Sequence, residues 1–137
     1  MSEPRVKLGN RIGPEECRVD ADWAMAYALA SNDPNPAYLS GGAVPPVFTV
    51  SMILPLFHAA NRDMLTPGAI TGATGGAHGQ HDLYLHKPVQ PGSTLHFFAD
   101  GYHASNTPAG ARTTVRVQLF DETNDLCVEH FWTSIHI

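Results

Sequence analysis

The segment formed by residues 48–60 constrains the fold of this chain more than any other. Apolar side chains recur along it at helical spacing, at Phe48, Met52, Ile53, Leu56, Phe57 and Ala60. Pro55 interrupts the pattern, because a proline inside a helix removes a backbone hydrogen bond. An N-cap at Ser51 would place Pro55 in or just beyond the first turn. We therefore predict one long, mostly buried helix that starts near Ser51, or is kinked there, and ends near residues 61–63.

Downstream of this helix the pattern changes to that of strands. Strands are predicted over residues 83–89, 95–105, 113–120 and 126–137, with connections of hairpin length between them. In the third of these, Val115, Val117 and Leu119 alternate with polar residues, which predicts one buried face. Because no β-α-β alternation is present, the sequence predicts an α+β fold with an antiparallel sheet.

A second, shorter helix is predicted upstream. Asp20 is a candidate N-cap, and residues 21–31 are rich in helix formers until two prolines and two Asx residues enforce a turn at residues 32–36. Trp23 and Tyr27 lie four residues apart and are expected to share a buried helix face. Residues 1–19 are expected to be a lead-in with one short edge strand.

Glycine is frequent between the long helix and the first predicted strand of the sheet. Gly68, Gly72, Gly75, Gly76 and Gly79 fall within twelve residues. This density argues against a regular element and predicts a mobile loop that ends beside His78.

Composition places the chain among single-domain globular proteins, and we treat residues 1–137 as one domain. The net charge of −5 leaves no basic stripe, so nucleic acid is not an expected partner. No run approaches the roughly 18 apolar residues of a spanning helix, so no membrane partner is expected. The N-terminus shows no secretory signal, and we expect a cytoplasmic protein with Cys17 and Cys127 as reduced thiols.

Three segments together resemble one known family. They are the Asp33-Pro34-Asn35-Pro36 turn, the Val-Pro-Pro-Val-Phe sequence of residues 44–48, and residues 78–92 with their His-Gly-Gln start and Pro-Gly end. The chain resembles the MaoC-like (R)-specific enoyl-CoA hydratase/dehydratase family, in particular its N-terminal, FAS1-like dehydratase type of domain. The resemblance implies a single hotdog fold, in which a curved antiparallel sheet wraps a long central helix, and no cofactor.

The same resemblance implies a site. In active members an aspartate and a histidine activate water for addition to an enoyl thioester, and a backbone N–H at the start of the central helix polarises the thioester carbonyl. Carried over to this chain, Asp33 is the catalytic residue, and the substrate-binding residues are Asn35, Tyr38, His78 and Gly79. Tyr38 stands where the family has its histidine, and Pro45 and Pro46 cannot offer an N–H.

These departures leave several functions open. The first is a hydratase/dehydratase component that binds an acyl-CoA or acyl-carrier thioester, with catalysis completed by a partner hotdog in a homodimer or heterodimer. The second is a non-catalytic thioester-binding or structural subunit, in which Asp33 and Asn35 only stabilise their turn. The third, a hotdog thioesterase, is disfavoured because residues 52–60 contain no carboxylate.

Three histidines are also candidate metal ligands. His78, His81 and His86 lie close in sequence, but His78 and His81 are three residues apart and would face opposite sides of a regular strand. No cysteine or carboxylate completes a ligand set near them. No metal site is therefore predicted.

Overall fold

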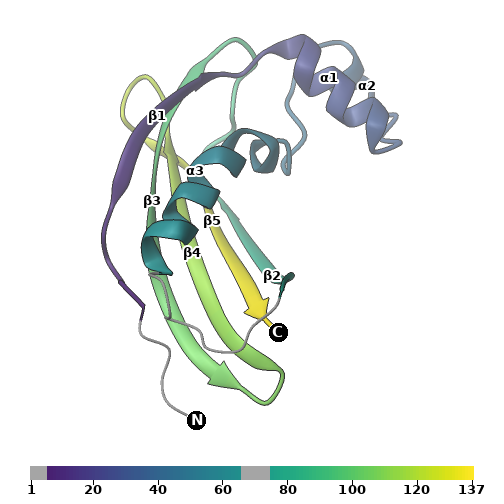
Figure 1. Cartoon of the computed structure of the whole chain (residues 1–137). Helices are drawn as coiled ribbons and strands as arrows, with labels where there is room; N and C mark the ends of the chain where they lie inside the picture. The colour runs from purple at the N-terminus through teal and green to yellow at the C-terminus, as the bar shows by residue number, and fades with distance from the viewer. Residues whose placement is uncertain (1–5, 66–74) are drawn as a thin grey trace.

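A curved antiparallel sheet of five strands surrounds one long helix in the part of the chain that the structure describes, residues 6–65 and 75–137 (Figure 1). The structure is a computed structural model. Its elements, in chain order, are β1 Ile12–Arg18, α1 Ala21–Ala30, α2 Pro36–Leu39, α3 Thr49–Met64, β2 Gly76–Leu85, β3 Thr94–Thr107, β4 Gly110–Phe120 and β5 Leu126–His136. This arrangement confirms the predicted α+β class and the single hotdog fold.

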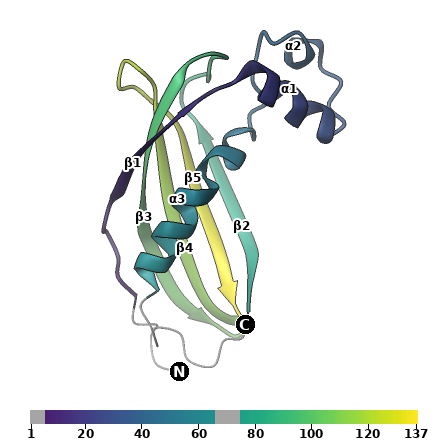
Figure 2. The ribbon, with the colours of Figure 1, turned by 45° about the horizontal axis from the view of Figure 1, so that its top comes forward.

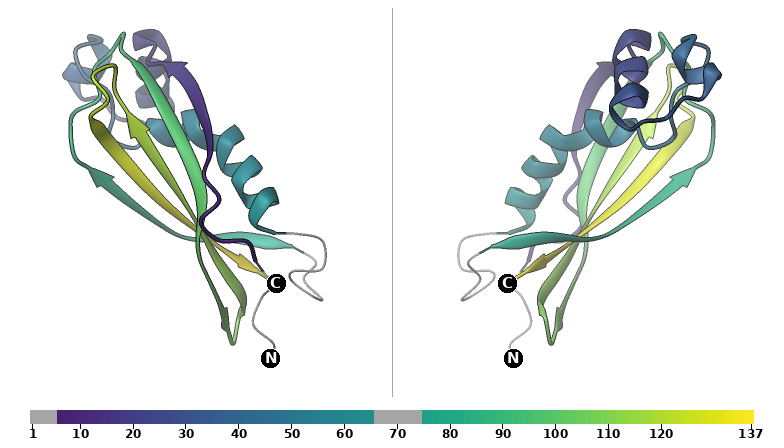
Figure 3. Two further views of the ribbon diagram at one scale, coloured as in Figure 1. Left: turned by 90° about the vertical axis from the view of Figure 1, so that its left-hand side faces the viewer. Right: turned by 90° about the vertical axis from the view of Figure 1, so that its right-hand side faces the viewer.

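Helix α3 lies along the concave face of the sheet and supplies one side of the core (Figures 1 and 2). The opposite side comes from inward-facing strand residues such as Val115, Val117 and Leu119, which are at most 1% exposed. All six members of the predicted apolar stripe are buried. In the edge-on views of Figure 3 the sheet and α3 form two layers, with α1 and α2 beyond one end of them.

The start of α3 differs from the prediction. The helix begins at Thr49 with Phe48 as N-cap, and Pro55 lies inside it. The hydroxyl of Ser51 donates to the Phe48 carbonyl at 2.6 Å instead of capping the helix. The prediction of an N-cap at Ser51 was therefore wrong, and packing of the buried stripe outweighs the local cost of Pro55.

The strand order is β1-β3-β4-β5-β2, with every neighbouring pair antiparallel. Strands β1 and β2 therefore form the two edges of the sheet among the described residues. The predicted N-terminal edge strand is confirmed by β1, which pairs with β3.

Strand β2 corrects the loop prediction in part. Gly76 and Gly79 lie within this strand, which runs over Gly76–Leu85 and so begins well before the predicted 83–89. Pairing with β5 along this length compensates for the poor strand propensity of glycine. Gly68 and Gly72 lie outside the described residues.

Helices α1 and α2 cover the end of the core where α3 begins (Figure 2). The predicted N-cap is confirmed, since Asp20 accepts hydrogen bonds from the N–H groups of Asp22 and Trp23. Trp23 and Tyr27 both pack edge-on against Phe48, with ring centroids 4.9 and 5.7 Å away. The two side chains thus share a contact with Phe48, but the prediction that their face is buried was wrong for Trp23, which is 38% exposed. The buried residues of α1 are Ala24 and Ala28.

Cys17 and Cys127 are free thiols. None of the helices in residues 6–65 and 75–137 is long and apolar enough to cross a membrane.

Candidate functional site

A cavity of about 340 Å³ opens where the chain enters α3. One wall is the connection from α2 to α3, and the other is the end of β2 with the loop that follows it. Its lining residues are Gly42, Ala43, Val44, Pro45, Pro46, Thr49, Leu85, His86, Lys87, Pro88, Val89 and Gln90. Most of these side chains are apolar, and the volume lies at the lower end of the range for small-molecule sites.

The backbone at the start of α3 is largely engaged in its own turn. The N–H groups of Phe48, Val50 and Ser51 donate to the carbonyls of residues 45, 47 and 48 at 3.0 to 3.1 Å. Pro45 and Pro46 have no N–H to offer. Thr49 is the residue of this segment with a polar side chain that lies among the cavity-lining residues, and it is almost fully buried.

Thr49 is the first member of a continuous hydrogen-bonded chain. Its Oγ1 lies 2.8 Å from Nε2 of His130 on β5, and both side chains are buried. The other nitrogen of His130, Nδ1, lies 2.8 Å from Nε2 of His81 on β2. Nδ1 of His81 in turn lies 3.1 Å from Nε2 of the exposed His78. Four side chains therefore connect the cavity wall to the sheet edge.

A β-bulge explains how His78 and His81 come to share a face. The register between β2 and β5 shifts between His78 and Gln80, which leaves Gly79 as the extra residue. A Cβ on Gly79 would lie 2.8 Å from Cγ1 of Ile135, so no larger residue fits without movement. The expectation that the two histidines face opposite sides was wrong, because it assumed a regular strand.

His78 also belongs to an aromatic stack. Its ring lies 4.2 Å from that of Trp132, which is itself stacked on Phe57 of α3 at 4.0 Å. The expectation of a loop histidine is corrected by its position in β2. The stack fixes the imidazole over an indole face, where a positive charge on the ring is stabilised.

Burial keeps the inner histidines neutral. Desolvation, with a smaller contribution from His81, lowers the pKa of His130 from 6.5 to about 3. Desolvation is also the main reason that the pKa of His81 is lowered, with His78 adding to it and Asp82 opposing it. Both rings therefore have one donor and one acceptor nitrogen near neutral pH.

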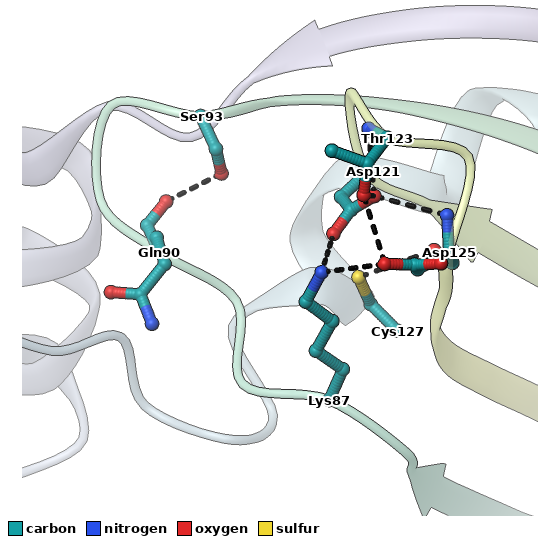
Figure 4. A network of polar contacts seen from close by, with 7 residues as sticks. All are labelled: Lys87, Gln90, Ser93, Asp121, Thr123, Asp125 and Cys127. Atoms are coloured by element: carbon teal, nitrogen blue, oxygen red, sulfur yellow. Dashed lines mark hydrogen bonds and ion pairs between the residues drawn. The ribbon is translucent and has the colours of Figure 1, made fainter.

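The cation in the cavity wall, Lys87, is committed to two carboxylates (Figure 4). Its Nζ donates to Asp121, and to Asp125 at 2.9 Å. These hydrogen bonds raise the pKa of Lys87 and are the first cause of the lowered pKa of Asp121, where Thr123 also contributes. The positive charge of Lys87 is therefore balanced within this chain.

The residues predicted for the site lie in two groups. Asp33, Asn35 and Tyr38 belong to the turn before α2 and to α2 itself, whereas His78 and Gly79 lie on β2. Oδ1 of Asp33 accepts from the Asn35 N–H at 3.1 Å. Oδ1 of Asn35 accepts from the Ala37 N–H at 3.0 Å and caps α2. Both hydrogen bonds are local, as expected if Asp33 and Asn35 stabilise their turn. None of the five predicted residues lines the cavity.

Two members of this hydrogen-bonded chain, Thr49 and His130, are not predicted from the sequence. A signal for His130 was present, because it alternates with Val128 and Trp132 in a strand whose inward face is apolar. A histidine on such a face must find hydrogen-bond partners. Thr49 carries no comparable signal.

No protein-family model matches the sequence, and no curated protein matches it either. Solved structures with the same fold do exist. The chain superposes on the HadBC (3R)-hydroxyacyl-ACP dehydratase complex of Mycobacterium tuberculosis with a TM-score of 0.75 and 17% identity, covering 98% of each chain. For the (R)-hydratase of A. caviae involved in PHA biosynthesis the TM-score is 0.66 with 17% identity, covering 96% of this chain and 97% of that one.

A third structure is longer. A MaoC-like dehydratase superposes with a TM-score of 0.75 and 18% identity over 97% of this chain but only 42% of its own. The present chain thus corresponds to a little under half of that protein. Together the three comparisons show that the chain has the hotdog fold of the MaoC-like dehydratases and (R)-hydratases.

Proposed function

We propose that this chain is a hydratase/dehydratase component that binds an enoyl or 3-hydroxyacyl thioester in the cavity at the start of α3. The observation that carries the proposal is this largely apolar cavity, set against the central helix of a fold shared with solved (R)-hydratase and dehydratase structures. Apolar walls from Val44, Leu85 and Val89 suit an acyl chain, and we propose the hydroxyl of the lining residue Thr49 as its polar contact.

The thioester would be carried by coenzyme A or by an acyl-carrier protein. Because Lys87 is already paired with Asp121 and Asp125, phosphate groups would find little free positive charge at the cavity wall. We therefore propose that recognition within this chain centres on the acyl and thioester portions.

A partner hotdog subunit is part of the proposal. Strand β2 is an edge of the sheet in the described residues, and its Tyr84 and Leu85 are more than half exposed. Unpaired edges with apolar side chains are surfaces that proteins usually cover. Addition of the same chain or of a second hotdog protein would cover this edge and complete the catalytic groups.

Asp33 is the carboxylate that we propose for the chemistry, with Asn35, Tyr38, His78 and Gly79 as substrate contacts in the assembled enzyme. Its local hydrogen bond engages Oδ1, and a carboxylate has a second oxygen that can accept a proton. A phenol such as Tyr38 is a poor base near neutral pH, so the usual histidine contribution must come from another group.

The test is hydration of crotonyl-CoA by the purified chain, alone and with hotdog partner subunits, followed by loss of the enoyl absorbance. We expect the thioester to raise the unfolding temperature of the chain alone and turnover to require Asp33. Asp33→Ala should abolish turnover, whereas Asp22→Ala, on the exposed first turn of α1, should not. Absence of both thermal protection and turnover would refute the proposal.

One alternative is supported by a specific observation. Because Asp33 and Asn35 both bond local N–H groups, the chain could be a non-catalytic thioester-binding or structural subunit. Asp33→Ala would then lower stability without affecting the turnover of a complete enzyme. A thioesterase is less well supported, since the carboxylate that α3 does contain, Asp63, is held by Lys7 and Asn10.

A further inference from the structure

The chain Thr49–His130–His81–His78 has a property that ordinary buried hydrogen bonds lack. Each histidine link joins a ring nitrogen of one residue to a ring nitrogen or hydroxyl of the next, at 2.8 to 3.1 Å. A neutral imidazole has one donor and one acceptor, so the orientation of one link fixes the orientation of all the others. The hydrogen bonds of these four residues can therefore have only two arrangements, with every donor directed outward or every donor directed inward.

We propose that these four side chains form a proton relay between the cavity at the start of α3 and the exposed edge strand β2. The inference deepens the proposed function, on which it rests: it supplies a proton route in a chain whose Tyr38 stands in place of the family histidine. Thr49 is the cavity end of the relay, His130 and His81 are its carriers, and His78 is its outer end.

In the starting state the Thr49 hydroxyl donates to Nε2 of His130, Nδ1–H of His130 donates to Nε2 of His81, and Nδ1–H of His81 donates to Nε2 of His78. A water in the cavity gives a proton to Oγ1 of Thr49, and each residue passes one proton outward. His78 ends as an imidazolium, and the hydroxide equivalent left in the cavity adds to the β-carbon of the enoyl thioester. The enolate that results takes its α-proton from a second water, and the hydroxide formed from that water is neutralised when His78 releases its proton. Dehydration runs the same steps in reverse.

The surroundings suit this division of roles. The ring of His130 is fully buried and bonded to Thr49 of α3, whereas the ring of His81 is half-buried beside Trp132. The outer ring of His78 is exposed and lies over Trp132, whose face stabilises the imidazolium.

Charges near the relay are few. Asp82 on β2 is the carboxylate that acts on His81, and its side chain accepts from Gln80. The other charges that act on the inner rings come from within the relay, from His78 on His81 and from His81 on His130.

A relay and a purely structural cluster differ in one measurable way. If His78 is protonated, its Nε2–H must donate to Nδ1 of His81, which forces His81 to donate from Nε2 and His130 to donate from Nε2 to Thr49. Protonation at the surface therefore reverses the tautomer of a fully buried ring.

We would follow this reversal by ¹⁵N NMR of histidine-labelled protein, without any substrate. The pH titration of His78 should exchange the pyrrole-type and pyridine-type signals of His130. In a His78→Gln variant the exchange should disappear. A His130 tautomer that stays the same while His78 takes up its proton would overturn the proposal.

A second measurement avoids acid altogether. At one fixed, mildly alkaline pH, His78→Lys places a permanent donor beside Nδ1 of His81, and His78→Glu places a permanent acceptor there. The two variants should show opposite tautomers of His130. The matched pair His103→Lys and His103→Glu, at an exposed position outside the relay, should leave His130 unchanged. The same tautomer in both His78 variants would also overturn the relay.

These readouts separate the relay from the proposed function. Tautomer coupling without thioester binding would retain the relay and refute the thioester site. Thioester binding and turnover without tautomer coupling would retain the thioester site and refute the relay.

Discussion

Replacing His130 by glutamine should change how the stability of this protein depends on pH. His130 is 0% exposed and bonded at both ring nitrogens, to Thr49 and His81. Glutamine also has a donor and an acceptor, so it can keep a partner on each side, but it cannot be protonated. The variant therefore removes one titration while keeping the site polar.

The direction and size of the change in the free energy of unfolding follow from the shifted pKa of His130. The folded-state pKa of His130 is about 3, against 6.5 for an ordinary histidine, so below pH 6.5 the unfolded chain binds a proton that the folded protein refuses. The unfolded state then has more bound protons, and the free energy of unfolding falls as the pH falls. Between about pH 7 and pH 5 this one residue lowers it by about 2 kcal/mol, and the slope is about 1.4 kcal/mol per pH unit.

The assay is urea unfolding of the wild type and of His130→Gln at about pH 7 and pH 5. Any packing defect of the glutamine is present at both pH values and cancels in the difference. His81 and His136, whose pKa values burial also lowers, remain in both proteins. The wild type should lose about 2 kcal/mol more than the variant on acidification.

Exposed His103 provides the control, since His103→Gln should keep the pH dependence of the wild type. Equal acid losses in the wild type and in His130→Gln would show that His130 is protonated in the folded state. The conclusion that the ring is neutral and fully desolvated would then be refuted.

Three further changes test other parts of the structure. Gly79→Ala should cost about 1–3 kcal/mol in urea unfolding, because its Cβ would meet Ile135, whereas Gly75→Ala has open space and should be near neutral. Phe48→Ala should cost about 3–5 kcal/mol, since Phe48 is fully buried beneath Trp23, and Val47→Ala at its half-exposed neighbour should stay within about 0.5 kcal/mol. Lys87→Met should raise the pKa values of the Asp121 and Asp125 carboxyls toward their ordinary values in a ¹³C NMR titration, because the Lys87 hydrogen bonds are the first cause of both shifts. Unchanged pKa values would contradict that origin. The control Lys7→Met should not change the pKa of either carboxyl.

The fold was predictable because its main determinants are periodic. The stripe from Phe48 to Ala60 and the alternation of Val115, Val117 and Leu119 each show a buried face directly in the sequence. Burial in the structure follows both patterns. The start of α3 is less predictable, because the local cap signal at Ser51 competes with the packing of Phe48 and Thr49 against the core, and the packing decides it.

The hydrogen-bonded chain to the cavity could not be predicted for a different reason. Thr49 and His130 are 81 residues apart, and His81 and His130 are 49 apart, so their contacts depend on the tertiary fold. The contact of His78 with His81 depends on a bulge at Gly79, which reverses the expected alternation. A glycine within a strand is a known sign of such a bulge, but the high density of glycines around Gly79 predicts a loop.

The strand order also bears on how the chain reaches its native state. Strands β3, β4 and β5 are consecutive in sequence and adjacent in the sheet, so they can pair through short connections. Both edges instead require distant partners. Strand β1 pairs with β3 across α1, α2, α3 and β2, and β2 pairs with β5 across β3 and β4. Closing long loops slows folding, so we expect the three-stranded meander to form first and the edges to join it late. The site is then among the last parts to be assembled, because both its cavity and its histidines depend on β2.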